Sequence, residues 1–428
     1  MPPISRPRGT EDLLPDRLAA MTEAVRVGMR VARGFGYREI ATPIFEATEL
    51  FVRGVGDTSD VVRREMYTFP DRSGRSLTLR PENTAPVLRA FGESSLRELP
   101  APVRLSYAGP MFRYDRPGKG RYRQFHQFGV EVVGDGEAEL DAEVIAVAWD
   151  WLIELGLGGI TLQLNSIGDA QCRPAFRRAL LAHFEPHLAQ LPELDRERLA
   201  RNPLRILDSK DPATEELVAT APSSREFLCP DCGDAFERVQ QALGAYRIPF
   251  HLNDRLVRGL DYYVRTAFEV WHEDLQGAQN ALFGGGRYDG LAELLGYPPA
   301  PGVGFAAGLE RVVMLAPSPA PPDPPQVVVC SAQAVAVSAA IVLAQLLRQD
   351  GLFVICDVGR RSLKAKMRVA ERSGAAAVAI LGEEEVKAEL ATLRRLQDGT
   401  QRSLPGADAA ALVRTWLGQD QPGAQDEG

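Results

Sequence analysis

A basic and aromatic stretch over residues 109–131 carries the clearest chemical pattern in the chain. It reads GPMFRYDRPGKGRYRQFHQFGVE, and its loop gathers side chains suited to phosphate groups: Arg116, Lys119, Arg121 and Arg123. Alternate residues of a strand share a face, so Gln127, Gly129 and Glu131 fall on one side together with Arg123 and Phe125. Such a face is a poor core and a good ligand-binding surface, although a solvated hairpin would also carry these charges.

A second segment, LVRGLDYY over residues 256–263, places one arginine before two tyrosines. The guanidinium of Arg258 can stabilise charge that develops on a transferring phosphoryl group without itself titrating. The hydroxyls of Tyr262 and Tyr263 can hydrogen-bond a ligand. In isolation the same letters would also describe a turn with packed tyrosines.

Two glycine-rich segments follow, FGGGRYDG over residues 283–290 and GVGFAAGLER over residues 302–311. A glycine triplet is usually a turn, but it also lets the backbone come close to a ligand. The spacing of the second segment does not fit a dinucleotide-binding loop.

The elements that must position these segments form roughly two to three domains, because 428 residues exceed one hydrophobic core. Strand-like runs without intervening helices predict a mainly antiparallel sheet in domain 1–320, with a helical insertion at about 169–245. The proline-rich segment 317–325 predicts a linker. Strands expected at 326–331, 352–357 and 376–381 alternate with helices at 333–348 and 362–372, which predicts a three-layer α/β domain with a largely parallel sheet over 326–418. We expect residues 419–428 to form a disordered tail.

Composition excludes several classes of protein. The net charge of −8 excludes a generally basic polyanion binder, so contacts with nucleic acid must use local patches at 113–123 and 360–372. No apolar run is long enough for a bilayer and no signal core opens the chain, so we expect a cytoplasmic protein. Cys229 and Cys232 form a lone C-x-x-C. With no second such pair in the sequence, we predict two reduced thiols and no metal held by the protein alone.

The stretch over 109–131 closely resembles motif 2 of the class II aminoacyl-tRNA synthetases, and the wording GRYRQFHQ followed by GVE is similar to the histidyl enzymes. The resemblance implies that Arg113 binds the ATP α-phosphate. The loop 116–123, with Arg121, would contact ATP and the acceptor end of tRNA. Gln127 and Glu131 would face the amino acid.

The other segments extend the resemblance over nearly the whole chain. LVRGLDYY resembles a segment peculiar to histidyl enzymes, in which Arg258 would act on the α-phosphate and histidine, and Tyr262 and Tyr263 would line the histidine pocket. The segment GGRYD would add Tyr288 to that pocket. GVGFAAGLER is similar to motif 3, whose arginine, here Arg311, would hold the γ-phosphate.

Two N-terminal segments also match the family. Residues 38–46, REIATPIFE, resemble motif 1, which forms the dimer. LRPENT over 79–84 resembles a loop in which Glu82 and Thr84 would hold the α-amino group. Asn83 stands where the family commonly has glycine. Because Asn is the best non-glycine residue for positive φ, we expect the loop to keep its shape.

The region after the linker looks like the family's anticodon-binding domain. Its helix over 362–372 carries four basic residues that could contact tRNA or simply be solvated: Lys364, Lys366, Arg368 and Arg372.

The resemblance implies a homodimeric histidine–tRNA ligase. Histidine would be activated by ATP with Mg²⁺, and the histidyl group would pass to the 3′ end of tRNA(His). The alternative is an inactive synthetase-like regulatory subunit of ATP phosphoribosyltransferase. The C-terminal domain and the intact LVRGLDYY segment disfavour this alternative, and the arginine set disfavours a tRNA-binding module without catalysis.

Overall fold

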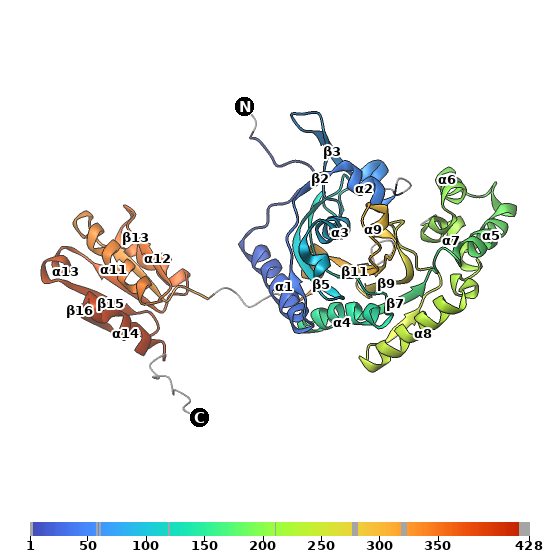
Figure 1. Ribbon diagram of the computed structural model, residues 1–428. Coiled ribbons are helices and arrows are strands. Elements are labelled where there is room, and N and C mark those ends of the chain that lie inside the picture. Colours follow the sequence, from blue (N-terminus) through green and yellow to red (C-terminus); the bar gives the residue numbers. More distant parts are fainter. Residues whose placement is uncertain are drawn as a thin grey trace, which may run out of the picture. The chain divides into compact units, whose positions relative to one another are not determined.

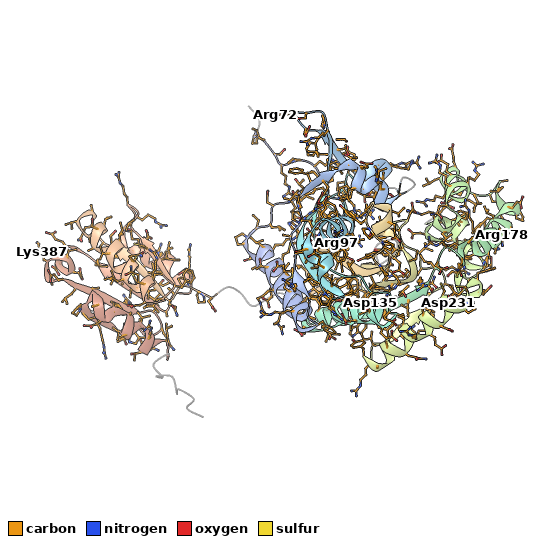
Figure 2. The ribbon with its side chains drawn as sticks, viewed as in Figure 1. Arg72, Arg97, Asp135, Arg178, Asp231 and Lys387 are labelled. Carbon is orange, nitrogen blue, oxygen red and sulfur yellow. The ribbon has the colours of Figure 1, made fainter. Side chains whose placement is uncertain are left out.

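The computed structural model describes residues 3–56, 59, 61–118, 120–209, 211–275, 281–317 and 323–418 (Figure 1). The chain divides into two compact units, Met1–Pro319 and Ala320–Gly428. Lys119, the middle of the proline-rich segment and the tail 419–428 lie outside the described residues. Charged side chains such as those of Arg72, Arg178 and Lys387 point outward (Figure 2).

The first unit is built on an eight-stranded sheet with the order β1-β5-β6-β11-β10-β9-β7-β8. Among the described strands of this sheet, only the pairs β1–β5 and β7–β8 are parallel, so the expected mainly antiparallel sheet is confirmed. The strands are β1 (Arg38–Glu39), β5 (Val103–Phe112), β6 (Gln124–Val133), β7 (Ile160–Ser166), β8 (Phe250–Leu252), β9 (Val264–His272), β10 (Ala281–Arg287) and β11 (Gly302–Gly308).

The main hydrophobic core covers one face of this sheet. Helices α1 (Pro15–Gly34), α4 (Glu139–Glu154) and α8 (Pro230–Ala245) contribute apolar side chains to it. The ring of Phe128 packs against Trp151 at 4.8 Å and against Phe305 at 5.9 Å, measured between ring centroids. These contacts place the face of β6 that carries Phe128, Val130 and Val132 in the core.

The first unit also contains shorter elements. They are α2 (Thr48–Val55), α3 (Thr84–Glu93), α9 (Leu291–Leu294), α10 (Leu309–Leu315) and a small sheet in the order β2-β4-β3, made of β2 (Phe45–Ala47), β3 (Tyr67–Pro70) and β4 (Ser76–Leu79). Arg80, in the loop over 79–84, connects this loop with β5 and with the segment 38–46. It donates to the carbonyl of Pro110 at 2.9 Å and to the carbonyl of Thr42 at 3.0 Å.

Residues between β7 and β8 form a helical segment that gathers at one side of the first unit (Figure 1). It contains α5 (Arg173–Phe184), α6 (Glu193–Arg201), α7 (Pro212–Ala219) and α8. Phe176, Leu180 and Phe184 of α5 belong to a small core of its own. The segment therefore packs on itself as well as on the sheet through α8.

The second unit is a five-stranded sheet in the order β13-β12-β14-β15-β16 with helices. The three strands expected from the sequence are parallel, and two further strands that the sequence analysis missed extend the sheet in antiparallel fashion. The elements are β12 (Val327–Ser331), α11 (Val337–Gln349), β13 (Val354–Asp357), α12 (Leu363–Arg372), β14 (Ala377–Leu381), α13 (Glu383–Ala388), β15 (Leu390–Arg395), β16 (Gln401–Pro405) and α14 (Ala409–Trp416).

Helix α12 corrects one expectation about its basic residues. Lys366 is buried, and its ammonium group donates to the carbonyls of Ser331 at 2.7 Å and Asp357 at 3.1 Å. It therefore holds the ends of β12 and β13 and does not face a partner. Lys364, Arg368 and Arg372 are exposed. In the described part of the chain, no helix is both long and apolar enough to cross a membrane.

Candidate active site

A cavity of about 270 Å³ opens in the first unit where β6, β10 and β11 meet the loops that precede α3 and β9. It brings together residues that lie far apart in the sequence. Nine of the predicted site residues line it: Glu82, Thr84, Arg113, Arg121, Gln127, Arg258, Tyr262, Tyr263 and Arg311.

The parity predicted for β6 is observed. Phe128, Val130 and Val132 point into the main core. Phe125 and Gln127 line the cavity on the opposite face. Because β6 lies between β5 and β11 in antiparallel register, both of its edges are paired and only its side chains are free to address a ligand.

Glu131 and Tyr288, which the resemblance places in the histidine pocket, do not line the open cavity but lie sealed beside it. The Glu131 carboxylate accepts hydrogen bonds from Thr84 Oγ1 at 2.7 Å, Tyr107 Oη at 3.2 Å and Tyr288 Oη at 2.5 Å. Desolvation raises the pKa of Glu131 to about 8, against these hydrogen bonds, which favour the charged form. Glu131 therefore holds Thr84 in place on the cavity wall.

Three guanidinium groups converge in the cavity. Arg113 Nε donates to the carbonyl of Pro81 at 2.8 Å, and Arg311 Nη1 donates to that of Ala281 at 2.8 Å. Arg121 pairs with Asp115 at 3.1 Å. The pKa of Arg311 is lowered by burial and then by the like charges of Arg121 and Arg113. Cations brought this close together form an attractive site for a polyanion.

The guanidinium of Arg258 lies close to Gly284 of β10. The same guanidinium pairs with Glu269 and stands 5.5 Å from the centroid of the Tyr263 ring. A Cβ at Gly284 would stand 2.1 Å from Arg258 Nη1. The missing side chain of Gly284 therefore makes room for an arginine of the protein itself. The sequence had suggested that the glycines make room for a ligand.

Glu82 presents a carboxylate at the start of α3. It accepts the backbone N–H groups of Thr84 at 2.7 Å and Ala85 at 3.2 Å, and only 3% of the residue is exposed. Burial raises its pKa, while these two hydrogen bonds and the charge of Arg113 lower it. The side chain is thus fixed by backbone donors at the cavity wall.

Asn83 corrects the expected backbone conformation of this loop. Its φ is −121°, so the position does not require the left-handed region. Its side-chain oxygen instead accepts hydrogen bonds from Thr42 Oγ1 at 2.6 Å and Arg80 Nη1 at 3.3 Å. Asn83 therefore anchors the loop through its side chain, a function that glycine could not supply.

Three polar atoms of cavity-lining residues are buried without a hydrogen-bond partner among the described residues: Gln127 Oε1, Arg258 Nε and Tyr262 Oη. An unsatisfied buried polar group costs about 1–3 kcal/mol, so native proteins rarely leave one without purpose. One acceptor and one cationic donor in the same cavity are suited to a ligand that carries both an ammonium and an anionic group.

The arginine-rich loop contributes less to the cavity than the sequence suggested. Arg123 does not line the cavity. It precedes β6, and its guanidinium lies 3.9 Å from the Tyr114 ring centroid. Arg116 does not line it either, which leaves Arg121 as the described basic residue of the loop that does.

Sequence reasoning missed several cavity residues, of which Glu310 is the most informative. Its carboxylate accepts the backbone N–H of His126 at 2.9 Å and contacts the His126 ring at Nδ1, also at 2.9 Å. It lines the cavity next to Arg311. Its place directly before that arginine in GLER was the available signal.

Comparisons with known proteins point to one family. A family model described as Histidyl-tRNA synthetase matches residues 9–312, and one described as Anticodon binding domain matches residues 326–416. The chain is 51% identical to a histidine–tRNA ligase of Moorella thermoacetica, and the match covers 96% of this chain and 98% of that protein.

Two solved structures are similar over most of the chain. Apo histidyl-tRNA synthetase of S. aureus matches with a TM-score of 0.78 at 34% identity, covering 96% of this chain and 99% of that one. A Bacillus halodurans structure, described as an ATP phosphoribosyltransferase regulatory subunit/histidyl-tRNA synthetase, matches with a TM-score of 0.63 at 24% identity, covering 88% and 98%, and shows the fold alone. Both family models match, and the relatives match over nearly their full length. The chain therefore belongs to the histidyl-tRNA synthetase family of class II aminoacyl-tRNA synthetases.

Proposed function

We propose that this chain is a histidine–tRNA ligase that works in two steps at the cavity. The carboxylate of histidine attacks the α-phosphorus of ATP in line, and diphosphate leaves. The 3′-terminal ribose hydroxyl of tRNA(His) then attacks the histidyl carbonyl, and AMP leaves. The observation that carries the proposal is the convergence of Arg113, Arg121 and Arg311 with the Glu82 carboxylate in one cavity.

The arginines divide the work of holding the triphosphate. Arg113 and Arg258 act on the α-phosphate, and Arg311 holds the γ-phosphate. Arg121, on the loop, reaches the same nucleotide. The positive charges of Arg121 and Arg113 contribute to lowering the pKa of Arg311. A bound triphosphate would neutralise this repulsion among the arginines, and its binding would be favoured as a result. The Phe125 ring in the cavity wall offers an aromatic face for the adenine.

Histidine is placed by groups that complement each of its parts. Glu82, Thr84 and Gln127 bind the ammonium, for which Glu82 and Gln127 Oε1 offer acceptors. Glu131 and Tyr263 address the two imidazole nitrogens, and Tyr288 orients Glu131. For this contact Glu131 exchanges a hydrogen bond with Thr84 for one with the ligand. Amino acids without such nitrogens leave these buried groups unpaired and are rejected, and no editing domain is required.

Catalysis then needs no protein nucleophile. Positioning converts the encounter of two bound substrates into a unimolecular step. The fixed charge of Arg258 stabilises the transition state at the α-phosphate, held by its pairing with Glu269.

The cavity fits Mg²⁺ brought in with ATP. The carboxylate of Glu310 lines the cavity beside Arg311, and carboxylate and phosphate oxygens are the ligands that this ion prefers. Glu310 would hold the ion together with the phosphates, and the ion would neutralise negative charge on the triphosphate.

The second unit is assigned to the anticodon side of tRNA, with the exposed Lys364, Arg368 and Arg372 as contacts.

We further propose a homodimer formed through the motif 1 region, where Ile44 and Phe45 expose apolar side chains at 45% and 52%. Five free cysteines fit a cytoplasmic location, where thiols stay reduced.

The test is histidine-dependent exchange of diphosphate into ATP by the purified chain, followed by transfer of labelled histidine to tRNA(His). We expect exchange with histidine and not with the other amino acids. A folded dimer that shows no exchange would exclude the proposal. Exchange without transfer to tRNA would exclude its second step alone.

A further inference from the structure

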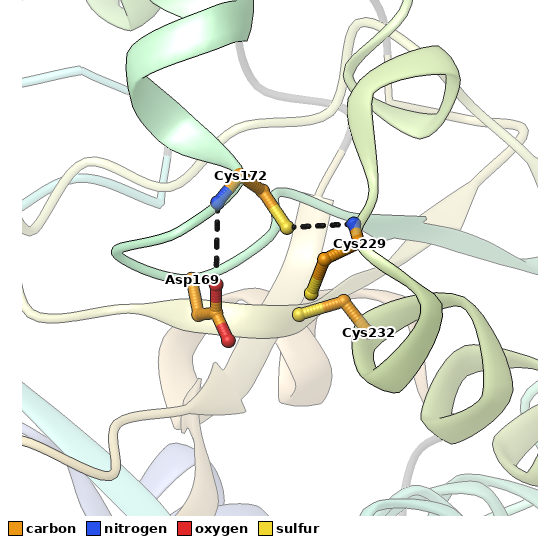
Figure 3. Close-up of side chains that lie close together, drawn as sticks. All are labelled: Asp169, Cys172, Cys229 and Cys232. Carbon is orange, nitrogen blue, oxygen red and sulfur yellow. Dashed lines mark hydrogen bonds between the residues drawn. The ribbon is translucent and has the colours of Figure 1, made fainter.

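Four potential metal ligands meet at the base of the helical segment (Figure 3). They come from two short segments, Asp169 with Cys172 and Cys229 with Cys232. One ligand atom from each residue lies within 4.8 Å of the other three. Cys172 and Cys232 are buried, and Asp169 and Cys229 are partly exposed. A search for a second C-x-x-C pair misses this site, because the two missing donors are supplied by a D-x-x-C segment far along the chain.

The donor set selects the metal. Thiolates are soft ligands that favour Zn²⁺ over Mg²⁺ or Ca²⁺. With Zn–S distances of about 2.3 Å, the sulfurs of a tetrahedral site lie about 3.8 Å apart, so the four atoms need to contract by only about 1 Å. Three thiolates and one carboxylate fill a tetrahedron. A site with no open position is structural and not catalytic.

The N-termini of two helices and several backbone donors surround the cluster. Helix α5 begins directly after Cys172 and helix α8 directly after Cys229, so the positive ends of two helix dipoles face the cluster. The backbone N–H of Cys229 donates to Cys172 Sγ at 3.0 Å. Asp169 accepts the backbone N–H groups of Gln171 at 2.9 Å and of Cys172 at 3.3 Å, which fixes its carboxylate at the cluster.

The cluster is also connected to the wall of the active site. Arg265 at the start of β9 lies 3.7 Å from the Asp169 carboxylate, and its backbone N–H donates to the carbonyl of Gly168 at 2.8 Å. Arg173, which follows Cys172, donates to the carbonyl of Tyr263, whose ring lines the cavity. A rigid cluster would therefore hold the entry to α5, the start of α8 and the start of β9 in one arrangement.

We propose that Asp169, Cys172, Cys229 and Cys232 bind one structural Zn²⁺ that fastens the start of α5 and the start of α8 to the catalytic sheet. This inference does not depend on the proposed aminoacylation. The competing possibility is a set of thiols that oxidises to a disulfide and binds no metal.

The experiment uses the full-length chain, purified in a phosphine reductant, stripped with a chelator and reloaded with Zn²⁺ or Co²⁺. We expect one Zn²⁺ per chain by elemental analysis. With Co²⁺ we expect the thiolate charge-transfer and strong visible bands of a tetrahedral site. The Zn²⁺ form should also unfold at a higher temperature than the stripped form.

Matched variants locate the site. Cys229→Ser removes a partly exposed ligand and should abolish both the metal and the Co²⁺ bands, and Asp169→Asn should weaken binding. Cys356→Ser removes a partly exposed thiol in the second unit and should leave both signals intact. Less than one tightly bound Zn²⁺ per two chains after reloading would overturn the proposal. So would equal loading of Cys229→Ser and the parent chain, or a disulfide within the cluster in protein isolated without the reductant.

Discussion

Replacing Gly284 by alanine should disable Arg258 without removing its charge. Gly284 lies in β10 on the wall of the cavity. An added Cβ would lie 2.1 Å from Arg258 Nη1 and 2.4 Å from its Cζ. The guanidinium cannot easily yield, because Glu269 pairs with it and the Tyr263 ring lies over it at 5.5 Å from the ring centroid. The substitution therefore displaces the arginine from the position that we assign to catalysis.

The size of the effect follows from this distance. Ordinary contact begins near 3.4 Å, so the guanidinium must move by about 1.3 Å or more. A displacement of about 1 Å in a catalytic group can cost roughly 100-fold in rate, which corresponds to about 2.7 kcal/mol of activation free energy. Arg258→Ala should cost about 10²- to 10³-fold, the range for the loss of one fixed donor at the transition state.

The assay is the kcat of histidine-dependent ATP–diphosphate exchange, with tRNA binding and the thermal midpoint measured in parallel. Both variants should keep nearly the parent affinity for tRNA, because Arg258 acts on the adenylate. Gly290→Ala is the matched control. Gly290 lies in the same glycine-rich segment, has φ of −89°, and an added Cβ would meet no atom within 4 Å.

The double variant decides whether the reasoning holds. If Gly284→Ala acts only by displacing Arg258, adding it to Arg258→Ala should cost less than about 3-fold, because the methyl group then occupies vacated space. Losses that multiply to about 10⁴-fold or more would show that Gly284 acts independently of Arg258. A Gly284→Ala enzyme with the parent rate, or an Arg258→Ala enzyme that loses tRNA affinity and exchange equally, would refute the assignment.

Three further predictions concern individual charges. Because burial raises the pKa of Glu131 to about 8 from 4.5, its contribution to stability is fully present below about pH 4.5 and is lost as the pH rises through about 8. The stability of Glu131→Gln relative to the parent should therefore rise between pH 5 and 8, by at most about 1.4 kcal/mol per pH unit in thermal or urea unfolding, and a pH-independent difference would contradict this pKa. Lys366→Ala should destabilise the second unit by about 1–3 kcal/mol, because it leaves buried carbonyls unpaired, whereas exposed Lys364→Ala should weaken tRNA binding and leave stability unchanged. The reverse pattern would mean that the two lysines are misassigned. Arg311→Ala should raise the KM for ATP by about 10- to 100-fold and leave that for histidine nearly unchanged, and an equal rise in both would place Arg311 elsewhere.

The sequence by itself determined the local patterns. The alternation in 123–131 separated the core-facing Phe128 and Val130 from Gln127, because side-chain parity follows from strand geometry alone. The strand–helix alternation after the linker predicted the three parallel strands of the second unit. The segments carrying Arg113, Arg258 and Arg311 were also recognisable without a structure, because each is a short continuous motif.

Only the tertiary structure decided how these segments meet. The strand order places β6, β10 and β11 side by side, and this order turns separate arginines into one cavity. Burial of Glu131 under Thr84 and Tyr288, and of Lys366 against Ser331 at the end of β12, depends on neighbours more than 30 residues away. The meeting of Cys172 with Cys229, 57 residues apart, has the same cause. Periodicity acts over a few residues, whereas contacts of this kind are fixed by the packing of whole elements, which no local pattern encodes.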